Sequence, residues 1–80
     1  MNITVLLFGI SSDLVGSSSL EFELPEHASV GDFKQTFLKK YRNLTQLNSY
    51  AIAVNENYSD DDTRLKDNDV VAVIPPVSGG

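Results

Sequence analysis

The chain has 80 residues, 41% of them hydrophobic and 21% charged, with a formal net charge of −5 at pH 7. This length suits one small domain, and the composition is that of a folded domain rather than a disordered or membrane-spanning chain. The negative charge argues against nucleic-acid binding, which needs a basic surface, and the lack of cysteine excludes disulfides, a reactive side-chain thiol and cysteine zinc sites.

An apolar run over residues 3–10 opens the chain. Towards its end the apolar residues occupy both alternating sets of positions, which is typical of a central strand covered on both faces. The run lacks the features of a signal peptide and is too short to cross a bilayer. We therefore expect a cytoplasmic protein with no membrane partner.

Residues 11–15 predict one helical turn that ends at Gly16, because glycine readily takes the left-handed conformation found after a helix. Residues 17–19 are serines with no base near them in the sequence, and we interpret them as a solvated loop. Residues 20–24 alternate apolar and acidic side chains, which predicts a half-buried strand ended by Pro25. This strand should pair with the first one in antiparallel fashion.

A helix is predicted to begin after Ser29, since Asp32 completes the Ser-x-x-Asp pattern of a capping box. The apolar residues that follow lie three or four positions apart, so they share one face that can cover a sheet. They are Val30, Phe33, Phe37, Leu38 and Tyr41. We interpret the basic remainder as a solvated helix face, with a docking patch as the alternative. It carries Lys34, Lys39, Lys40 and Arg42.

Residues 44–49 are predicted to form a loop and residues 50–54 a third strand, followed by a turn over 55–57 and a short return from Tyr58. Residues 60–62 are consecutive aspartates, which suggest a cation site because hard cations prefer several carboxylate oxygens. Their spacing is not that of an EF-hand loop, so we interpret the run as a charged turn and predict no metal site.

Asn68 suits a left-handed turn position, and the apolar run over residues 70–74 predicts a second central strand. The first and last strands are too apolar for a sheet edge, so we place them side by side. The connection between them contains a helix, as a parallel pair requires. The sequence thus predicts an α+β domain over residues 1–74, a β-grasp (ubiquitin-like) fold with a mixed sheet and one main helix across one face, followed by an extended tail over residues 75–80.

Parallel pairing of these strands would bring Phe8 and Ile74 together beside the start of the tail. It would also divide the apolar side chains between the two faces of the sheet. Ile3, Val5, Leu7, Val71 and Val73 would face the helix. Leu6, Phe8, Ala72 and Ile74 would form a patch on the open face. We interpret this patch as a docking surface for a protein partner.

The tail reads Pro75-Pro76-Val77-Ser78-Gly79-Gly80. Prolines cannot donate to a β-ladder and hold the backbone extended, and glycines let the backbone pass close to another surface. No nucleophile–base pair or phosphate-binding glycine loop is present in the sequence, and we interpret His27 as a surface residue. The reactive group is therefore the carboxylate of Gly80. Adenylation by ATP on another enzyme would activate it, after which sulfur could produce a thiocarboxylate or an amine could produce an amide.

The sequence resembles the small subunit of molybdopterin synthase, the MoaD family, over essentially its whole length. The tail carries the strongest match, and the others are Val5-Leu6-Leu7-Phe8, Asp13-Leu14-Val15-Gly16, Ala53-Val54-Asn55 and Leu65-Lys66-Asp67-Asn68-Asp69-Val70-Val71. Many members carry Arg-Glu where this chain has Ser12-Asp13, and Asp-Gly-Asp where it has Asp67-Asn68-Asp69.

This resemblance implies that a ubiquitin-activating-like adenylyltransferase uses ATP to activate Gly80, which then becomes a thiocarboxylate. It implies that the tail enters the large subunit of the synthase and gives sulfur to cyclic pyranopterin monophosphate, with two small subunits flanking a large-subunit dimer. No bound cofactor is implied. Two alternatives stay open: a ubiquitin-like modifier joined to lysines through Gly80, and a sulfur carrier for thiamine or another product. The Pro-Pro-Val-Ser segment before the glycines favours the molybdopterin role.

Overall fold

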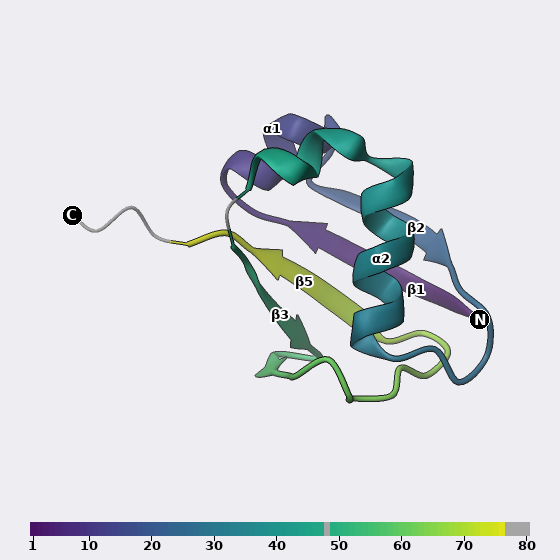
Figure 1. The fold of residues 1–80 in the computed structure, drawn as a ribbon. Helices are drawn as coiled ribbons and strands as arrows, with labels where there is room; N and C mark the ends of the chain where they lie inside the picture. Colours follow the sequence, from purple (N-terminus) through teal and green to yellow (C-terminus); the bar gives the residue numbers. More distant parts are fainter. Residues whose placement is uncertain (48, 77–80) are drawn as a thin grey trace.

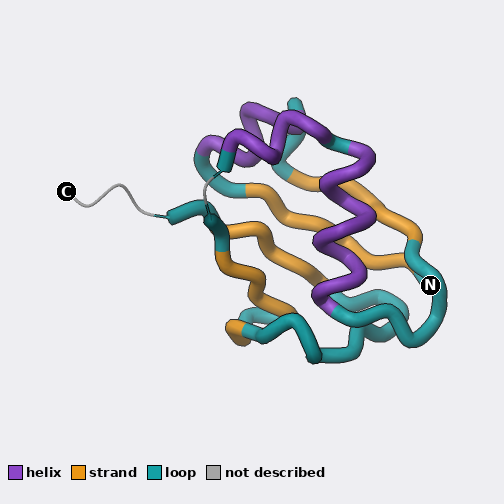
Figure 2. Tube along the Cα trace, viewed as in Figure 1, coloured by secondary structure: helices purple, strands orange, loops and turns teal. Residues whose placement is uncertain are grey.

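The computed structural model describes residues 1–47 and 49–76, in which a five-stranded mixed sheet carries one main helix across one face (Figure 1). Figure 2 shows this helix crossing the strands, with shorter helical segments at one end of the sheet. The elements are β1 (Asn2–Leu7), α1 (Ile10–Val15), β2 (Ser19–Glu23), α2 (Val30–Lys40), the 3₁₀ helix η1 (Arg42–Gln46), β3 (Ala51–Val54), β4 (Asn57–Tyr58) and β5 (Val70–Ile74). The strand order is β2-β1-β5-β3-β4. This is the predicted β-grasp, ubiquitin-like fold.

The first and last strands, β1 and β5, lie side by side within the sheet, each between two other strands. They run parallel, with Thr4 opposite Val70 and Leu7 opposite Val73. The other strand pairs are antiparallel. The predicted pairing of the first and last strands is therefore confirmed, and its consequence is that β1 and β5 end at the same end of the sheet.

The hydrophobic core lies between the sheet and α2. Val5 and Val71 from the two central strands are fully buried. Phe33 and Phe37 of α2 stack with their ring centroids 5.0 Å apart, and Phe22 of β2 meets both rings edge-on. Full burial of one such side chain stabilises the fold by about 1.5–3 kcal/mol. The sequence predicts that five residues of the central strands face the helix, and all five are buried, as expected. They are Ile3, Val5, Leu7, Val71 and Val73.

Local sequence signals set the ends of several elements. At the start of α2, Ser29 Oγ accepts the N–H of Asp32 at 3.1 Å, and Asp32 Oδ2 accepts the N–H of Ser29 at 3.0 Å. This reciprocal pair is the predicted capping box. Gly16, with φ 87°, ends α1 in the left-handed conformation, and Asn68 takes φ 71° in the turn before β5. Both positions agree with the sequence-based expectation.

One predicted loop is partly helical. The sequence predicts a loop over residues 44–49, whereas Arg42–Gln46 form the 3₁₀ helix η1, in which Leu44 is 2% exposed. A single 3₁₀ turn is too short to produce an apolar periodicity, so the pattern of the sequence does not reveal it. In the part of the chain that the structure describes, no helix has the length and apolar character needed to cross a membrane.

Candidate functional site

The C-terminal end of β5 is where the chain leaves the sheet. Ile74 is the last residue of β5, and Pro75 and Pro76 follow it (Figure 1). Neither proline has a backbone N–H, so neither can extend the ladder as a donor. The residues to which the sequence assigns the chemistry, Val77, Ser78, Gly79 and Gly80, lie outside the described residues. The site that the structure defines is thus the root of the tail.

A tight corner between β1 and α1 lies against this root. Gly9 has φ 55° and ψ −135°, a conformation that L-amino acids with a side chain rarely adopt. A β-carbon built on Gly9 would lie 3.7 Å from Cγ of Pro75. The ends of β1 and β5 therefore lie close together, as the sequence predicts, because Gly9 and Pro75 just beyond them are direct neighbours. In the sequence Gly9 appears only as the residue that ends the first strand, and a glycine so close to the end of a buried strand is a recognisable signal of such a corner.

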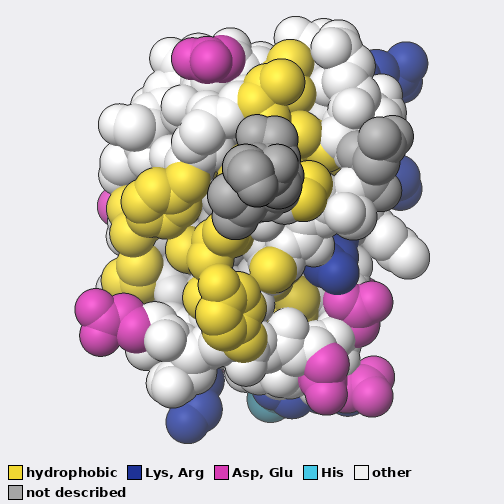
Figure 3. Space-filling model, turned by 90° about the vertical axis from the view of Figure 1, so that its left-hand side faces the viewer, with side chains coloured by type: hydrophobic (Ala, Val, Ile, Leu, Met, Phe, Trp, Pro, Cys, Tyr) yellow, Lys and Arg dark blue, Asp and Glu magenta, His cyan; other side chains and the backbone are white. Residues whose placement is uncertain are grey.

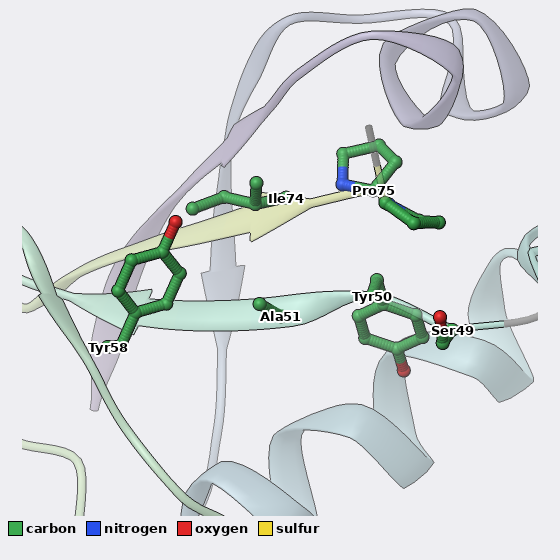
Figure 4. Close-up of a pocket in the computed structure, with 7 residues that line it drawn as sticks. Ser49, Tyr50, Ala51, Tyr58, Ile74 and Pro75 are labelled. Atoms are coloured by element: carbon green, nitrogen blue, oxygen red, sulfur yellow. The ribbon is translucent and has the colours of Figure 1, made fainter. Parts of the chain in front are cut away.

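A hollow of about 400 Å³ lies on the other side of the tail root. Figure 4 shows Tyr58 and Ile74 on the same side of β3, with the Tyr58 hydroxyl directed towards Ile74, whereas the ring of Tyr50 points towards α2. Its seven lining residues are Ser49, Tyr50, Ala51, Tyr58, Ile74, Pro75 and Pro76. Most of its wall is apolar, so the hollow suits an apolar side chain from another protein.

The predicted patch on the open face is only partly exposed. Leu6, Ala72 and Ile74 are half-buried, because strands flank them on both sides, whereas Phe8 is 49% exposed. Figure 3 shows hydrophobic side chains gathered on this end of the molecule. Tyr58 is 75% exposed and enlarges the apolar surface beyond the residues that the sequence analysis assigned to it. Its signal in the sequence is an aromatic residue inside an otherwise polar run.

The acidic turn after β4 forms contacts within the fold, one of them to α2. Asp61 Oδ1 accepts a hydrogen bond from Nζ of Lys34 on α2 at 2.7 Å, and Oδ1 of Asp60 accepts the N–H of Asp62 at 3.1 Å. Within the described ranges, no three histidine, cysteine, aspartate or glutamate side chains gather in a way that could hold a metal ion. Burial raises the pKa of Tyr50, which lines both this acidic turn and the hollow.

Comparisons with known proteins give sequence matches over nearly all of the chain or all of it. A sequence model of the ThiS family matches residues 5–80. The molybdopterin synthase sulfur carrier subunit of Aedes aegypti is 38% identical, with 100% of this chain and 90% of that protein covered. The corresponding subunit of Chlamydomonas reinhardtii is 35% identical, with 100% of both chains covered.

Several solved structures share the fold, among them the following three. A Pyrococcus furiosus protein described as subunit 1 of a molybdopterin converting factor has a TM-score of 0.88 and 34% identity, covering 96% of this chain and 99% of that one. A chain in the Helicobacter pylori complex of subunits 1 and 2 of molybdopterin-converting factor has a TM-score of 0.72 and 28% identity, covering 100% of both. Small archaeal modifier protein 1 of Methanosarcina acetivorans has a TM-score of 0.83 and 26% identity, covering 99% and 96%.

Proposed function

The chain belongs to the ThiS family and is a relative of molybdopterin synthase sulfur carrier subunits, and from this premise we propose that it carries sulfur on its C-terminal Gly80 for molybdenum cofactor biosynthesis. The observation that carries the proposal is the similarity along the full length of both chains, up to and including the Gly-Gly end. The exposed apolar surface around the tail root supports it, because a carrier must dock on the proteins that load and unload it.

The proposed chemistry takes place on the carboxylate of Gly80. The carboxylate attacks the α-phosphorus of ATP on an adenylyltransferase that resembles ubiquitin-activating enzymes, and pyrophosphate leaves. A sulfide-level donor, in the simplest case hydrosulfide, then attacks the acyl carbon of the adenylate, displaces AMP and loses its proton, which leaves a thiocarboxylate. In the large subunit the thiocarboxylate sulfur forms a bond to a carbon of cyclic pyranopterin monophosphate and displaces an oxygen substituent from it. Water then hydrolyses the resulting thioester, which leaves the sulfur on the pterin and restores the carboxylate of Gly80. ATP is bound by the activating partner, and this chain supplies the acyl group.

The described residues support delivery of this group into another protein. Pro75 and Pro76 prevent the tail from pairing as a further stretch of β5. A tail of six residues reaches at most about 20 Å when extended. Leu6, Phe8 and Ile74 are the residues that we propose to face the large subunit, and two small subunits would flank a large-subunit dimer in the cytoplasm. The complex of two subunits known from Helicobacter pylori makes such a pairing reasonable for this chain.

The test is mass spectrometry of the intact chain after incubation with the activating enzyme, ATP and a sulfur donor. The expected result is replacement of one C-terminal oxygen by sulfur, located on Gly80 by fragmentation. A sample without ATP is the control and should remain unchanged. A chain that never gains sulfur, although the same enzyme loads another carrier, would disprove the proposal.

A protein modifier is the second candidate, and the similarity to small archaeal modifier protein 1 favours it. In this case a lysine amine of a target protein would attack the acyl adenylate, or an ester derived from it, and form an isopeptide bond to Gly80. The same incubation with cell extract distinguishes the two roles. Gly-Gly remnants on lysines of other proteins would support the modifier, whereas a thiocarboxylate without such remnants supports the carrier.

A further inference from the structure

Ser11 is the one residue with a polar side chain that is buried in the described part of the chain, with 0% exposure. Its hydroxyl group forms two hydrogen bonds with the backbone of Phe8. Oγ accepts the N–H of Phe8 at 3.1 Å and donates to the carbonyl oxygen of Phe8 at 2.6 Å. A buried hydroxyl that satisfies both backbone groups of one residue supports the chain conformation at that residue.

The register of the parallel pair explains why Phe8 needs these bonds. Thr4 lies opposite Val70, and the N–H of Thr4 donates to the carbonyl oxygen of Asp69 at 2.9 Å, so even-numbered residues of β1 bond to β5. In such a ladder, each bonded residue accepts from the residue that follows its partner. The paired residues end with Leu7 and Val73; if the register continued one step further, Phe8 would stand opposite Ile74 and its carbonyl oxygen would accept from the residue after Ile74.

The residue in that place is Pro75, which has no N–H to donate. The Phe8 carbonyl accepts two donors from Ser11 instead, the backbone N–H at 3.1 Å and the hydroxyl at 2.6 Å. We propose that Ser11, with its hydroxyl as the shorter of the two bonds, takes the place of the missing donor and thereby positions the root of the tail. The geometry of the corner agrees with this role. Ser12 Oγ donates to the carbonyl oxygen of Gly9 at 2.8 Å, so the backbone is held on both sides of the residue that lies against Pro75.

This inference rests on the proposed function, because a positioned tail matters only if another protein must receive it. Ser11 is fully buried, so we assign it as a positioning residue that acts through Gly9 and Pro75. If the corner loses its fixed geometry, only a fraction of the molecules presents the tail in the direction that a partner accepts. The apparent affinity falls by that fraction, while the rate of the bound complex stays the same.

The first test measures the geometry and is independent of the proposed function. Ser11→Ala removes both hydroxyl bonds, Ser11→Cys replaces the hydroxyl by a slightly larger thiol that forms only weak hydrogen bonds, and Ser29→Ala is the control that removes a serine hydroxyl at the start of α2. We expect the nuclear Overhauser effect between Gly9 and the ring of Pro75 to weaken in Ser11→Ala and, to a lesser extent, in Ser11→Cys, but not in Ser29→Ala. Undiminished effects in both Ser11 variants would overturn the proposal. Ser11→Cys decides the matter if Ser11→Ala does not fold.

The second test measures adenylation of each variant by the activating enzyme. We expect the KM for Ser11→Ala to rise about three- to tenfold with kcat within about twofold of the parent value, and both constants of Ser29→Ala to stay unchanged. Equal KM values for Ser11→Ala and Ser29→Ala would overturn the positioning role. A parent chain that is not adenylated at all would instead contradict the proposed function, and the geometric test would still decide on Ser11.

A rescue variant examines the missing donor directly. Pro75→Ala in the Ser11→Ala background gives position 75 an N–H that can donate to the carbonyl oxygen of Phe8. We expect this amide to exchange its hydrogen slowly, as members of the β1–β5 ladder do. The N–H of residue 11 still donates to the Phe8 carbonyl in this background, so the variant asks whether the carbonyl takes a second donor. Exchange at the rate of an unprotected amide would show that it does not, and would overturn the account of the Ser11 hydroxyl.

Discussion

Gly9 and Pro75, 66 positions apart in the sequence, are neighbours in space: a β-carbon on Gly9 would lie 3.7 Å from Cγ of Pro75. This distance alone is an ordinary van der Waals contact, so space would allow alanine at position 9. The backbone does not, because φ 55° with ψ −135° strains an L-residue that has a side chain. Conformation rather than crowding therefore requires glycine at the root of the tail.

We expect Gly9→Ala to lower the free energy of unfolding by about 1–3 kcal/mol, the cost of holding a residue in a sparsely populated conformation. Urea unfolding followed by circular dichroism measures it. Gly16→Ala is the matched control, since Gly16 has φ 87° and ψ 17° and an added β-carbon there meets no atom within 4 Å. Its cost should be smaller, about 1 kcal/mol, because alanine tolerates this left-handed region better. Equal costs would contradict the argument.

Changes at the very end of the chain should separate function from stability. Deletion of Gly80, or addition of one residue after it, is expected to abolish sulfur loading, because the reacting carboxylate is then missing or displaced. The melting temperature should stay within about 1 °C of the parent value, since the last residues of a chain generally contribute little to stability. Mass spectrometry and thermal unfolding provide the two measurements. An extended chain that accepts sulfur without being trimmed would refute the proposed role of Gly80.

The exposed aromatic ring beside the tail-root hollow provides a test of docking. Tyr58→Ala should leave the free energy of unfolding within about 0.5 kcal/mol of the parent value, because the side chain is 75% exposed. It should weaken binding to the large subunit about tenfold or more, as loss of a central aromatic anchor typically does. Calorimetric titration measures this affinity, and Tyr58→Phe, which keeps the ring, is the control. Unchanged affinity in Tyr58→Ala would remove Tyr58 from the interface.

The aromatic cluster under α2 should dominate stability. Phe33 is 1% exposed and stacks on Phe37 while Phe22 meets it edge-on. Phe33→Ala is expected to cost about 3–5 kcal/mol, a large part of the roughly 5–15 kcal/mol that stabilises a domain. Denaturant titration measures the loss. Thr36→Ala, at an exposed position of the same helix, should change stability by less than about 0.5 kcal/mol.

The capping box at the start of α2 should make stability depend on pH. Hydrogen bonds from the backbone N–H and hydroxyl of Ser29 hold the pKa of Asp32 below its usual range. A carboxyl group with a depressed pKa in the folded state stabilises the fold above its unfolded pKa and loses this contribution as the pH falls through its folded pKa.

Asp32→Asn is therefore expected to be less stable than the parent at neutral pH, with a difference that shrinks as the pH falls below about 4. Urea midpoints of both proteins across this range provide the measurement. The effect should be small, because the carboxyl group is exposed to solvent. A difference that grows on acidification would contradict the sign of this linkage.

The sequence alone was sufficient for most of the fold. Several signals come from residues that are neighbours in the sequence. They are the alternation of apolar and acidic residues in β2, the apolar runs of β1 and β5, the apolar face of α2 and the capping box formed by Ser29 and Asp32. The order of the elements then left few arrangements, since a helical connection between two buried strands favours a parallel pair at the centre. The Gly-Gly end and its proline lead-in pointed to the same family that the comparisons identify.

The tertiary structure decided what lies around the tail root. The hollow combines residues 49–51 with Tyr58 and residues 74–76, which no sequence window unites. In the sequence, Ser11 is part of a short polar helical turn. The structure shows that its hydroxyl donates to the carbonyl oxygen of Phe8, and the β1–β5 register shows that Pro75, which lacks an N–H, cannot donate to this carbonyl. Periodicity and capping depend on groups a few residues apart, so the sequence displays them. A missing hydrogen-bond donor at position 75 matters only once the strands are paired, because pairing determines which carbonyl it would have served.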